Sequence, residues 1–269
     1  MDFAARTDVG RARENNEDSF LLAPELGLFV LSDGMGGYAS GEVASKLTVE
    51  AIVSECRAAD ADSGYFFTGP RVEGISEISN RLASAVRAAN QAIRAAALKN
   101  SAQGGMGATV VALRFSGERL SIAHVGDSRA YRFRSGEFQQ LTADHSFIAE
   151  QVRQGRMSAA EAERSPLQNV LVRALGPDPD VEVDVSEETV LDGDSFLVCS
   201  DGLTRELSDA QIAGVLAESN DAQSAADRLI ALANDAGGAD NITVVIARNA
   251  PRLAGAFSRI GRWFKDSEA

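Results

Sequence analysis

Short apolar runs separated by polar turns dominate the chain. Each run is rich in β-branched or aliphatic residues and is bounded by Gly, Asp, Asn or Ser, which is the pattern of buried β-strands. The Ser-Gly pairs at positions 116–117 and 135–136 predict tight hairpin turns, so the strands on either side should be antiparallel. The predicted strands are Gly27–Leu31, Ala108–Phe115, Arg119–Val125, Arg129–Arg134, Val181–Ser186, Ser195–Cys199 and Ile242–Ala247.

Five other segments repeat their apolar residues every three or four positions, as amphipathic helices do. The clearest repeat contains Ile78, Leu82, Ala85 and Ala89. Strands and helices come in blocks rather than in strict alternation, which favours an α+β fold over a doubly wound sheet. The predicted helices are Gly41–Cys56, Ser76–Lys99, Phe147–Gln154, Ser208–Ala217 and Ala222–Asn234.

Length and charge narrow the class of protein. The chain has 269 residues, of which 45% are hydrophobic, enough for one large domain or two small ones. No linker precedes about position 249, so we predict one domain over residues 1–249 and a basic amphipathic tail over residues 250–269. The formal net charge of −13 argues against nucleic acid as a partner, because such partners need a basic surface.

The cysteine count and the N-terminus predict a cytoplasmic protein. The two cysteines, Cys56 and Cys199, form neither a disulfide framework nor a metal-binding spacing. No apolar run approaches the roughly 18 residues of a membrane span, and no signal-peptide core follows Met1.

Acidic residues recur beside the predicted strands. Residues 28–34 and 196–202 are near copies, with four apolar residues followed by Ser-Asp-Gly. Another Asp follows the strand that ends at Val125, and one more precedes the strand that begins at Ile242. Two further acidic residues lie together near the N-terminus. These six candidates are Glu17, Asp18, Asp33, Asp127, Asp201 and Asp240.

Carboxylates gathered at the edge of a core repel one another and raise one another's pKa, unless a cation lies between them. Oxygen ligands suit Mg²⁺ or Mn²⁺, whereas Zn²⁺ sites usually include His or Cys. Only His124 and His145 are present, and neither has a ligand spacing, so we interpret both as structural residues. The alternative is that each Asp-Gly pair only marks a turn, but that does not explain why all of them adjoin apolar strands.

An ordered series of motifs now resembles a known family. Its members are Arg13-x-x-Asn-Glu-Asp18, Ser32-Asp-Gly-Met-Gly-Gly37, Gly107-Ala-Thr109, Val125-Gly-Asp-Ser-Arg129, Ser200-Asp-Gly202 and Gly238-x-Asp-Asn241. The series is similar to that of the metal-dependent protein phosphatases of the type 2C class, in particular the bacterial serine/threonine phosphatases. The resemblance covers about residues 3–248 and implies a four-layer α-β-β-α sandwich, with two antiparallel sheets between helices.

The resemblance also implies a role for each motif residue. Asp33 matches the aspartate that bridges two Mn²⁺ or Mg²⁺ ions, and the carbonyl of Gly34 matches a ligand of one ion. The other matched residues also belong to the metal centre or to its surroundings. They are Asp201 and Asp240 as ligands of the other ion, Glu17 and Asp18 as acidic groups around the pair, Asp127 as a contributor to a third ion, and Asn241 in support.

Arg13 matches the guanidinium that binds the substrate phosphate. A planar, permanently charged group suits such a contact. Two ions that share a hydroxide lower its pKa toward about 7, and that hydroxide would attack phosphorus directly. The implied activity is hydrolysis of phosphoserine and phosphothreonine, with phosphorylated proteins, substrates of a Ser/Thr kinase, as partners of a monomer.

Two other functions stay open at this point. One is a small-molecule phosphomonoesterase, which handles phosphate in the same way. The other is a catalytically weak phosphoprotein-binding sensor, although Arg13 and the aspartates of the motifs are intact. The chain departs from the family at Met35 and Tyr38, where relatives have histidines, and at Ser165–Gln168, where His-Pro-x-Arg is common. These departures concern substrate preference and a mobile flap rather than metal binding.

Two segments carry further hypotheses. Residues 143–166 match the flap of the family, and we expect Arg153 and Arg156 to steer phosphorylated segments toward the acidic site; a merely solvated helix face is the alternative. The tail carries four basic residues between Pro251 and Lys265. It would contact either anionic lipid or its own domain.

Overall fold

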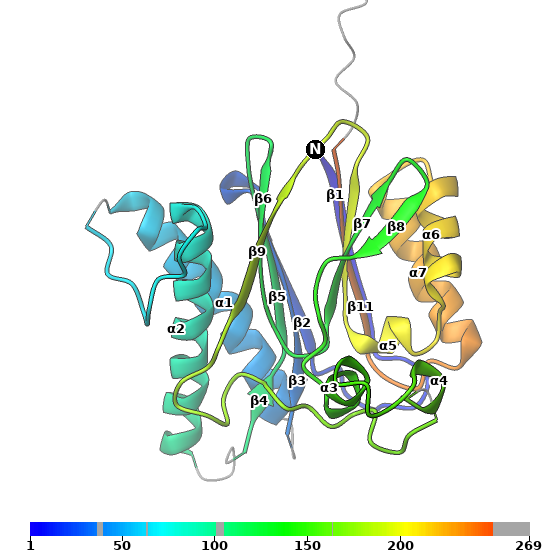
Figure 1. Ribbon diagram of the computed structural model, residues 1–269, viewed down its shortest axis with the longest axis horizontal. Helices are drawn as coiled ribbons and strands as arrows, with labels where there is room; N and C mark the ends of the chain where they lie inside the picture. Colours follow the sequence, from blue (N-terminus) through cyan, green and yellow to red (C-terminus); the bar gives the residue numbers. More distant parts are fainter. Residues whose placement is uncertain (37–39, 63, 101–104, 163, 250–269) are drawn as a thin grey trace, which may run out of the picture.

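Two antiparallel sheets form the centre of the molecule (Figure 1). The computed structural model describes residues 1–36, 40–62, 64–100, 105–162 and 164–249. The first sheet has the order β1-β11-β10-β7-β8, and the second has the order β2-β3-β5-β6-β9, with the short β4 paired to β3. The first sheet comprises β1 (Asp2–Asp8), β11 (Ile242–Arg248), β10 (Ser195–Cys199), β7 (Arg129–Arg134) and β8 (Glu137–Gln140). The second comprises β2 (Asp18–Ala23), β3 (Leu28–Met35), β4 (Gly107–Ala108), β5 (Val110–Ser116), β6 (Arg119–Val125) and β9 (Asp184–Thr189).

Helices cover the outer face of each sheet, which completes the predicted four-layer α-β-β-α sandwich (Figure 1). The long helices α1 (Ser40–Ala61) and α2 (Glu77–Lys99) pack on the second sheet, and α6 (Asp209–Glu218) and α7 (Ala222–Ala236) lie outside the first. The shorter helices are η1 (Pro24–Leu26), α3 (Phe147–Arg153), α4 (Ala159–Ala162) and α5 (Asp201–Thr204). Of these, η1 lies at the end of the sheets where β3 begins, and the other three lie near the opposite end (Figure 1).

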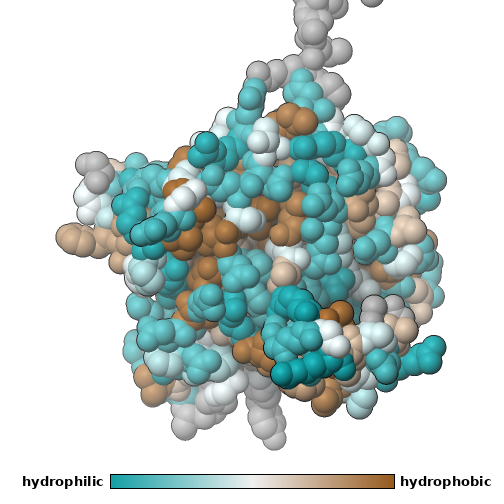
Figure 2. Space-filling model, in the orientation of Figure 1, coloured by the Kyte–Doolittle hydropathy of each residue, from teal (hydrophilic) through white to brown (hydrophobic). Residues whose placement is uncertain are grey.

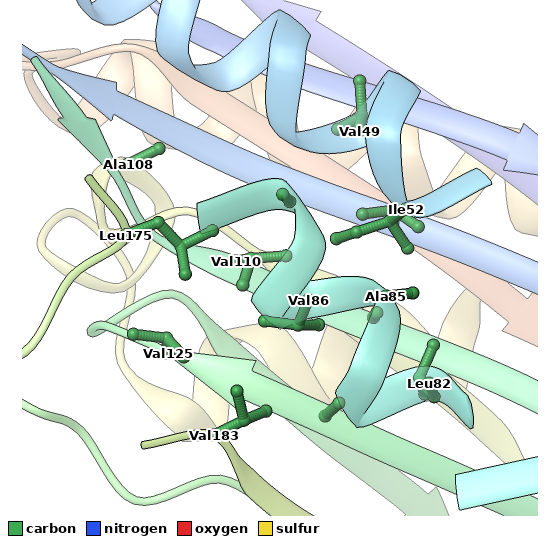
Figure 3. Close-up of a cluster of buried hydrophobic side chains, with 14 of the residues drawn as sticks. Val49, Ile52, Leu82, Ala85, Val86, Ala108, Val110, Val125, Leu175 and Val183 are labelled. Atoms are coloured by element: carbon green, nitrogen blue, oxygen red, sulfur yellow. The ribbon is translucent and has the colours of Figure 1, made fainter. Parts of the chain in front are cut away.

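Three apolar clusters hold the four layers together. The largest lies between the second sheet and its helices, where Ile52 of α1 and Leu82 and Val86 of α2 meet Val110 and Val125 (Figure 3). A second cluster joins the first sheet to α6 and α7, and a third fills the space between the sheets. Each fully buried aliphatic side chain stabilises the fold by about 1.5–3 kcal/mol.

The surface agrees with the charge of the chain. Hydrophilic residues cover most of the face shown in Figure 2, as expected for a net charge of −13. Among the described residues, no helix is both long enough and apolar enough to cross a membrane. The tail predicted over residues 250–269, and Tyr38, lie outside the described residues.

Most predicted elements are present, and the differences have local causes. The strands β1, β2 and β8 were not predicted because they are largely polar or only partly buried. The strand predicted over Val181–Ser186 is β9, shifted to Asp184–Thr189. Val181 and Val183 are buried in the largest apolar cluster before the strand begins. The predicted hairpin turns are confirmed, since β5 pairs with β6 and β7 with β8.

Candidate metal centre

The acidic residues of the sequence motifs meet at one end of the two sheets. Asp33 lies inside β3, because this strand continues to Met35 instead of ending at Leu31 as predicted. Asp18 opens β2 and is the direct cross-strand partner of Asp33. From the other sheet, Asp201 follows β10 as the first residue of α5, and Asp240 precedes β11. Antiparallel pairing within each sheet and the packing of the two sheets therefore bring together residues that are up to 222 positions apart.

Thr109 holds the backbone of Asp33 in place. The amide of Thr109 donates to the carbonyl oxygen of Asp33 at 2.8 Å, and the amide of Asp33 donates to the Thr109 hydroxyl at 3.1 Å. The Thr109 hydroxyl also lies 2.7 Å from that of Ser128, next to Asp127. This explains the Gly107-Ala-Thr109 motif in structural terms, since its threonine connects two acidic positions.

Asn241 ties the N-terminal loop to the site. Its side-chain oxygen accepts from the amide of Glu17 at 2.8 Å, and its amide group donates to the carbonyls of Val9 and Asn15 at 3.0 and 2.9 Å. The loop that carries Arg13 and Glu17 is therefore held against the start of β11. Asn241 also donates its own backbone amide to Oδ1 of Asp240 at 2.9 Å, so it connects Glu17 to Asp240.

The glycine of each Ser-Asp-Gly motif is required by close backbone contact. A Cβ on Gly34 would overlap the carbonyl oxygen of Gly41, and one on Gly202 would overlap that of Asn241. Neither neighbouring group is a flexible side chain, so a larger residue would force the backbone apart. Neither glycine marks a turn, because Gly34 lies in β3 and Gly202 in α5.

Burial and mutual repulsion raise the pKa of several of these carboxyl groups. For Asp33 burial is the larger cause, and the charges of Asp18 and Asp201 add to it, so its pKa lies well above the usual range. The same causes raise the pKa of Asp18 to about 7. Burial also raises the pKa of Asp201 and of Glu17. Without a cation the centre therefore favours protonated carboxyls at neutral pH.

Two carboxylate oxygens of this centre have no hydrogen-bond partner within the described residues. Asp18 accepts at Oδ2 from the Ser200 hydroxyl at 2.7 Å, but its Oδ1 is buried and unpartnered. Oδ1 of Asp201 is in the same position. Buried acceptors normally have a partner, and leaving one without costs about 1–3 kcal/mol. An all-oxygen donor set with unpartnered oxygens fits a hard divalent cation such as Mn²⁺ or Mg²⁺.

Two arginines border the acidic groups. Arg13 donates to Oδ2 of Asp240 at 2.9 Å, and its side chain is 52% exposed. Burial lowers the pKa of Arg13, but the hydrogen bond to Asp240 and the charges of the surrounding carboxylates together raise it by more, so its pKa lies above the ordinary value. Arg205 contacts the same oxygen at 3.0 Å and also binds Asp201. The sequence analysis did not single out Arg205; the only signal was its position four residues after Asp201 on a short helix.

A cleft of about 820 Å³ opens beside the centre. Asp127 and Asp201 line it together with residues of α3, which belongs to the predicted flap. Burial, together with the charge of Asp201, raises the pKa of Asp127 to about 7. The charge of Asp201 thus acts on Asp127, and both carboxylates line the same cleft.

A second group of polar residues, built around two buried histidines, was not predicted from the sequence. We call it the histidine cluster; it consists of His124, His145, Arg173 and Asp184. The two histidine rings stack with their centroids 4.6 Å apart, and Nε2 of His145 lies 3.2 Å from Asp184. Its members come from four separate segments, so no local sequence pattern connects them.

Comparison with known proteins identifies the family to which this fold and acidic centre belong. Residues 10–243 match the family described as protein phosphatase 2C, and the chain belongs to it. It is 39% identical over 264 residues to the serine/threonine protein phosphatase PstP of Mycobacterium tuberculosis strain H37Rv, covering 95% of this chain and 48% of that protein. It is 35% identical over 244 residues to the serine/threonine phosphatase stp of Listeria innocua, covering 90% and 93%. The chain thus spans about half the length of PstP and most of the Listeria protein.

Solved structures agree with this assignment. The crystal structure of M. tuberculosis PstP/Ppp superposes with a TM-score of 0.80 at 38% identity, covering 93% of this chain and 98% of that one. The catalytic domain of PstP in complex with two manganese ions gives a TM-score of 0.78 at 38% identity, covering 92% and 97%. The predictions of the family and of the four-layer fold are therefore confirmed.

Proposed function

We propose that this chain is a metal-dependent phosphatase that hydrolyses phosphoserine and phosphothreonine monoesters of proteins. The observation that carries the proposal is the meeting of buried carboxylates, two of them with unpartnered oxygens, beside the half-exposed guanidinium of Arg13. Membership of the protein phosphatase 2C family supports the same activity. The relatives named above carry the name serine/threonine phosphatase, which supports phosphoproteins as the substrate class.

The proposed ligands follow the predicted roles. Asp33 would bridge two ions, with the carbonyl of Gly34 as a ligand of one ion and Asp201 and Asp240 as ligands of the other. The remaining acidic groups would complete the surroundings, and these are Glu17, Asp18 and, for a third ion, Asp127. When bound, Mn²⁺ or Mg²⁺ supplies the activated water and the positive charge that phosphoryl transfer requires.

The residues of the chain would do the positioning. Asp240 holds Arg13 at the rim of the centre, where its guanidinium would contact the phosphate oxygens and stabilise charge as the ester bond breaks. Asn241 and Thr109 would keep Glu17 and Asp33 in register with it. The mechanism needs no nucleophilic side chain, and both cysteines are buried.

The finer predictions extend this proposal. We infer that residues 1–249 form the catalytic domain, that the protein acts as a cytoplasmic monomer and that its substrates are products of a Ser/Thr kinase. The alternative is a small-molecule phosphomonoesterase, for which the same centre would serve. The cleft beside Asp127 favours a polypeptide substrate, because it is larger than one phosphate requires.

The test is hydrolysis of an aryl phosphate with and without Mn²⁺. Activity should require the metal and should be lost in Asp33→Ala and in Asp201→Ala. The matched control is Asp235→Ala, which removes an exposed carboxylate from α7 and should leave the activity unchanged. Metal-independent turnover, or full activity in either site variant, would contradict the proposal. A panel of phosphopeptides and phosphosugars then separates the protein phosphatase from the small-molecule enzyme.

A further inference from the structure

Arg205 contacts two of the carboxylates that would bind an ion in the proposed metal centre. It ends the short helix α5, one turn after Asp201, and its backbone amide donates to the carbonyl oxygen of Asp201 at 2.9 Å. Its guanidinium donates to Oδ2 of Asp240 at 3.0 Å and also forms an ion pair with Oδ2 of Asp201. One side chain therefore connects the two carboxylates that the proposed function assigns to the same ion.

A guanidinium and a divalent cation compete for such oxygens. Each carboxylate has a limited number of lone pairs, and Oδ2 of Asp240 already accepts from both Arg13 and Arg205. Two positive charges close to one carboxylate also repel each other, more strongly where water is partly excluded. An ion that binds Asp201 and Asp240 must therefore weaken or displace the contacts of Arg205.

Arg205 also has room to withdraw. Its side chain is 29% exposed and, with its neighbours Thr204 and Glu206, lines the cleft that leads to Asp127. A long, flexible side chain at the end of a four-residue helix can change rotamer without moving a strand. By contrast, Asp201 and Asp240 are attached to β10 and β11, which are held by the sheet.

We propose that Arg205 is a built-in cation that competes with divalent ions for Asp201 and Asp240. This inference rests on the proposed metal centre. In the ion-free protein, Arg205 offsets part of the repulsion among the carboxylates, and in the loaded protein its guanidinium turns into the cleft. Arg205 thereby lowers the affinity for metal and stabilises the ion-free state.

Mn²⁺ binding by isothermal titration calorimetry tests this directly, with thermal unfolding in EDTA as a second measurement. Arg205→Gln should bind Mn²⁺ about tenfold more tightly than the wild type, the size of one lost charged hydrogen bond. Arg205→Lys, which keeps the charge but loses the two-pronged contact, should lie between them. In EDTA, Arg205→Gln should unfold at a lower temperature than the wild type, because the carboxylates lose their counter-charge.

The control is Arg228→Gln, which changes the net charge equally at the exposed pair with Glu218 and should alter neither measurement. Equal or weaker Mn²⁺ binding by Arg205→Gln would overturn the inference while leaving the proposed function intact. A wild-type protein that binds no Mn²⁺ would contradict both. If Arg205→Gln did not fold, tighter binding by Arg205→Lys would still support the competition, and unchanged binding would refute it.

Discussion

The metal centre and the histidine cluster are both groups of ionisable residues that are at least half buried, but their hydrogen bonding differs. In the centre, Asp18 and Asp201 each keep a buried oxygen without a partner among the described residues. In the histidine cluster, His145 accepts at Nδ1 from the amide of Gly126 at 3.1 Å, and His124 contacts the carbonyl of Ala143 through Nε2 at 3.0 Å. The unpartnered carboxylate oxygens of the centre leave room for a ligand, whereas these ring nitrogens are already bonded within the framework.

The residue types in the histidine cluster would, by themselves, suggest a metal site. His124, His145 and Asp184 offer ligand atoms within 4.8 Å of one another, which is a composition that could hold a metal ion. With Nδ1 accepting from Gly126, however, the Nε2–H of His145 donates to Asp184, which also accepts from Arg173, so these atoms already have partners. The stacked rings of the two histidines also do not converge on one point. The earlier interpretation of both histidines as structural residues is consistent with these contacts.

The histidine cluster is hydrogen-bonded to the loop that carries Asp127. The amide of His145 donates to the carbonyl of Gly126 at 2.9 Å, and the carbonyl of His145 accepts from Val172 at 2.9 Å. Both ends of the segment that contains α3 and α4 are thus joined to the loop that carries Asp127. The histidine cluster and the metal centre differ in chemistry, but hydrogen bonds connect them through this loop.

The largest expected effect comes from Asp33→Asn. It keeps the size of the side chain but removes the proposed bridging charge, so aryl-phosphate turnover should fall by about 100- to 1000-fold. Because the same substitution relieves repulsion among buried carboxylates, the melting temperature in EDTA should stay the same or rise. Steady-state kinetics and thermal unfolding measure the two effects. A variant that lost activity because it was destabilised would contradict the distinction between site and framework.

The pH dependence of stability should distinguish the two regions by sign. Asp18 and Asp127 have folded pKa values of about 7, above their unfolded values. The folded state therefore binds more protons than the unfolded state, and stability falls as the pH rises toward 7. His145 has a folded pKa of about 4, below its unfolded value, so its contribution makes stability rise between about pH 4 and 6.5.

Thermal unfolding at several pH values, with EDTA or with saturating Mn²⁺, separates these contributions. The melting temperature with Mn²⁺ minus that with EDTA should increase by about 5 °C or more between pH 5 and pH 7. Each kcal/mol of stability corresponds to roughly 2–4 °C. Asp33→Asn should shrink this gap. A gap that did not depend on pH would show that the carboxylates of the centre do not titrate as their burial implies.

His145→Phe tests the framework. Phenylalanine keeps the stacked ring but leaves the amide of Gly126 without its acceptor, which should destabilise the protein by about 1–3 kcal/mol. Mn²⁺ affinity should change by less than about threefold, because Asp33, Asp201 and Asp240 do not contact this ring. Urea unfolding and calorimetry measure the two quantities. Loss of Mn²⁺ binding comparable to that of Asp33→Asn would place His145 in the metal centre after all.

The same contrast explains what the sequence could predict. Asp33 and Asp201 were found because each follows an apolar strand and precedes a glycine, a pattern contained in seven consecutive residues. The histidine cluster joins positions 124, 145, 173 and 184, of which Asp184 opens an edge strand with little apolar character. Arg205 carries no motif, and its importance depends on Asp240, which comes 35 residues later. A motif at a strand end can be found in a few consecutive residues. A contact between residues of different strands or sheets has no such local pattern.

The smallest expected effect concerns the flap, where the structure divides the two arginines that the sequence analysis had treated together. Arg153 lines the cleft and is held by Glu150 at 2.6 Å. Arg156 is exposed beyond the end of α3, and it is not among the described residues that line the cleft. Only Arg153 is therefore placed to meet an anionic polypeptide that extends from the metal centre.

Arg153→Glu should raise the Michaelis constant for a phosphopeptide about three- to tenfold and leave that for an aryl phosphate within twofold, since the small substrate does not reach along the cleft. Arg156→Glu, the matched control with the same change of charge, should move neither constant by more than twofold. The difference should shrink in 0.5 M salt, where the screening length falls to about 4 Å. If Arg153→Glu and Arg156→Glu behaved alike, long-range charge alone would steer the substrate, and the cleft would not be where the polypeptide binds.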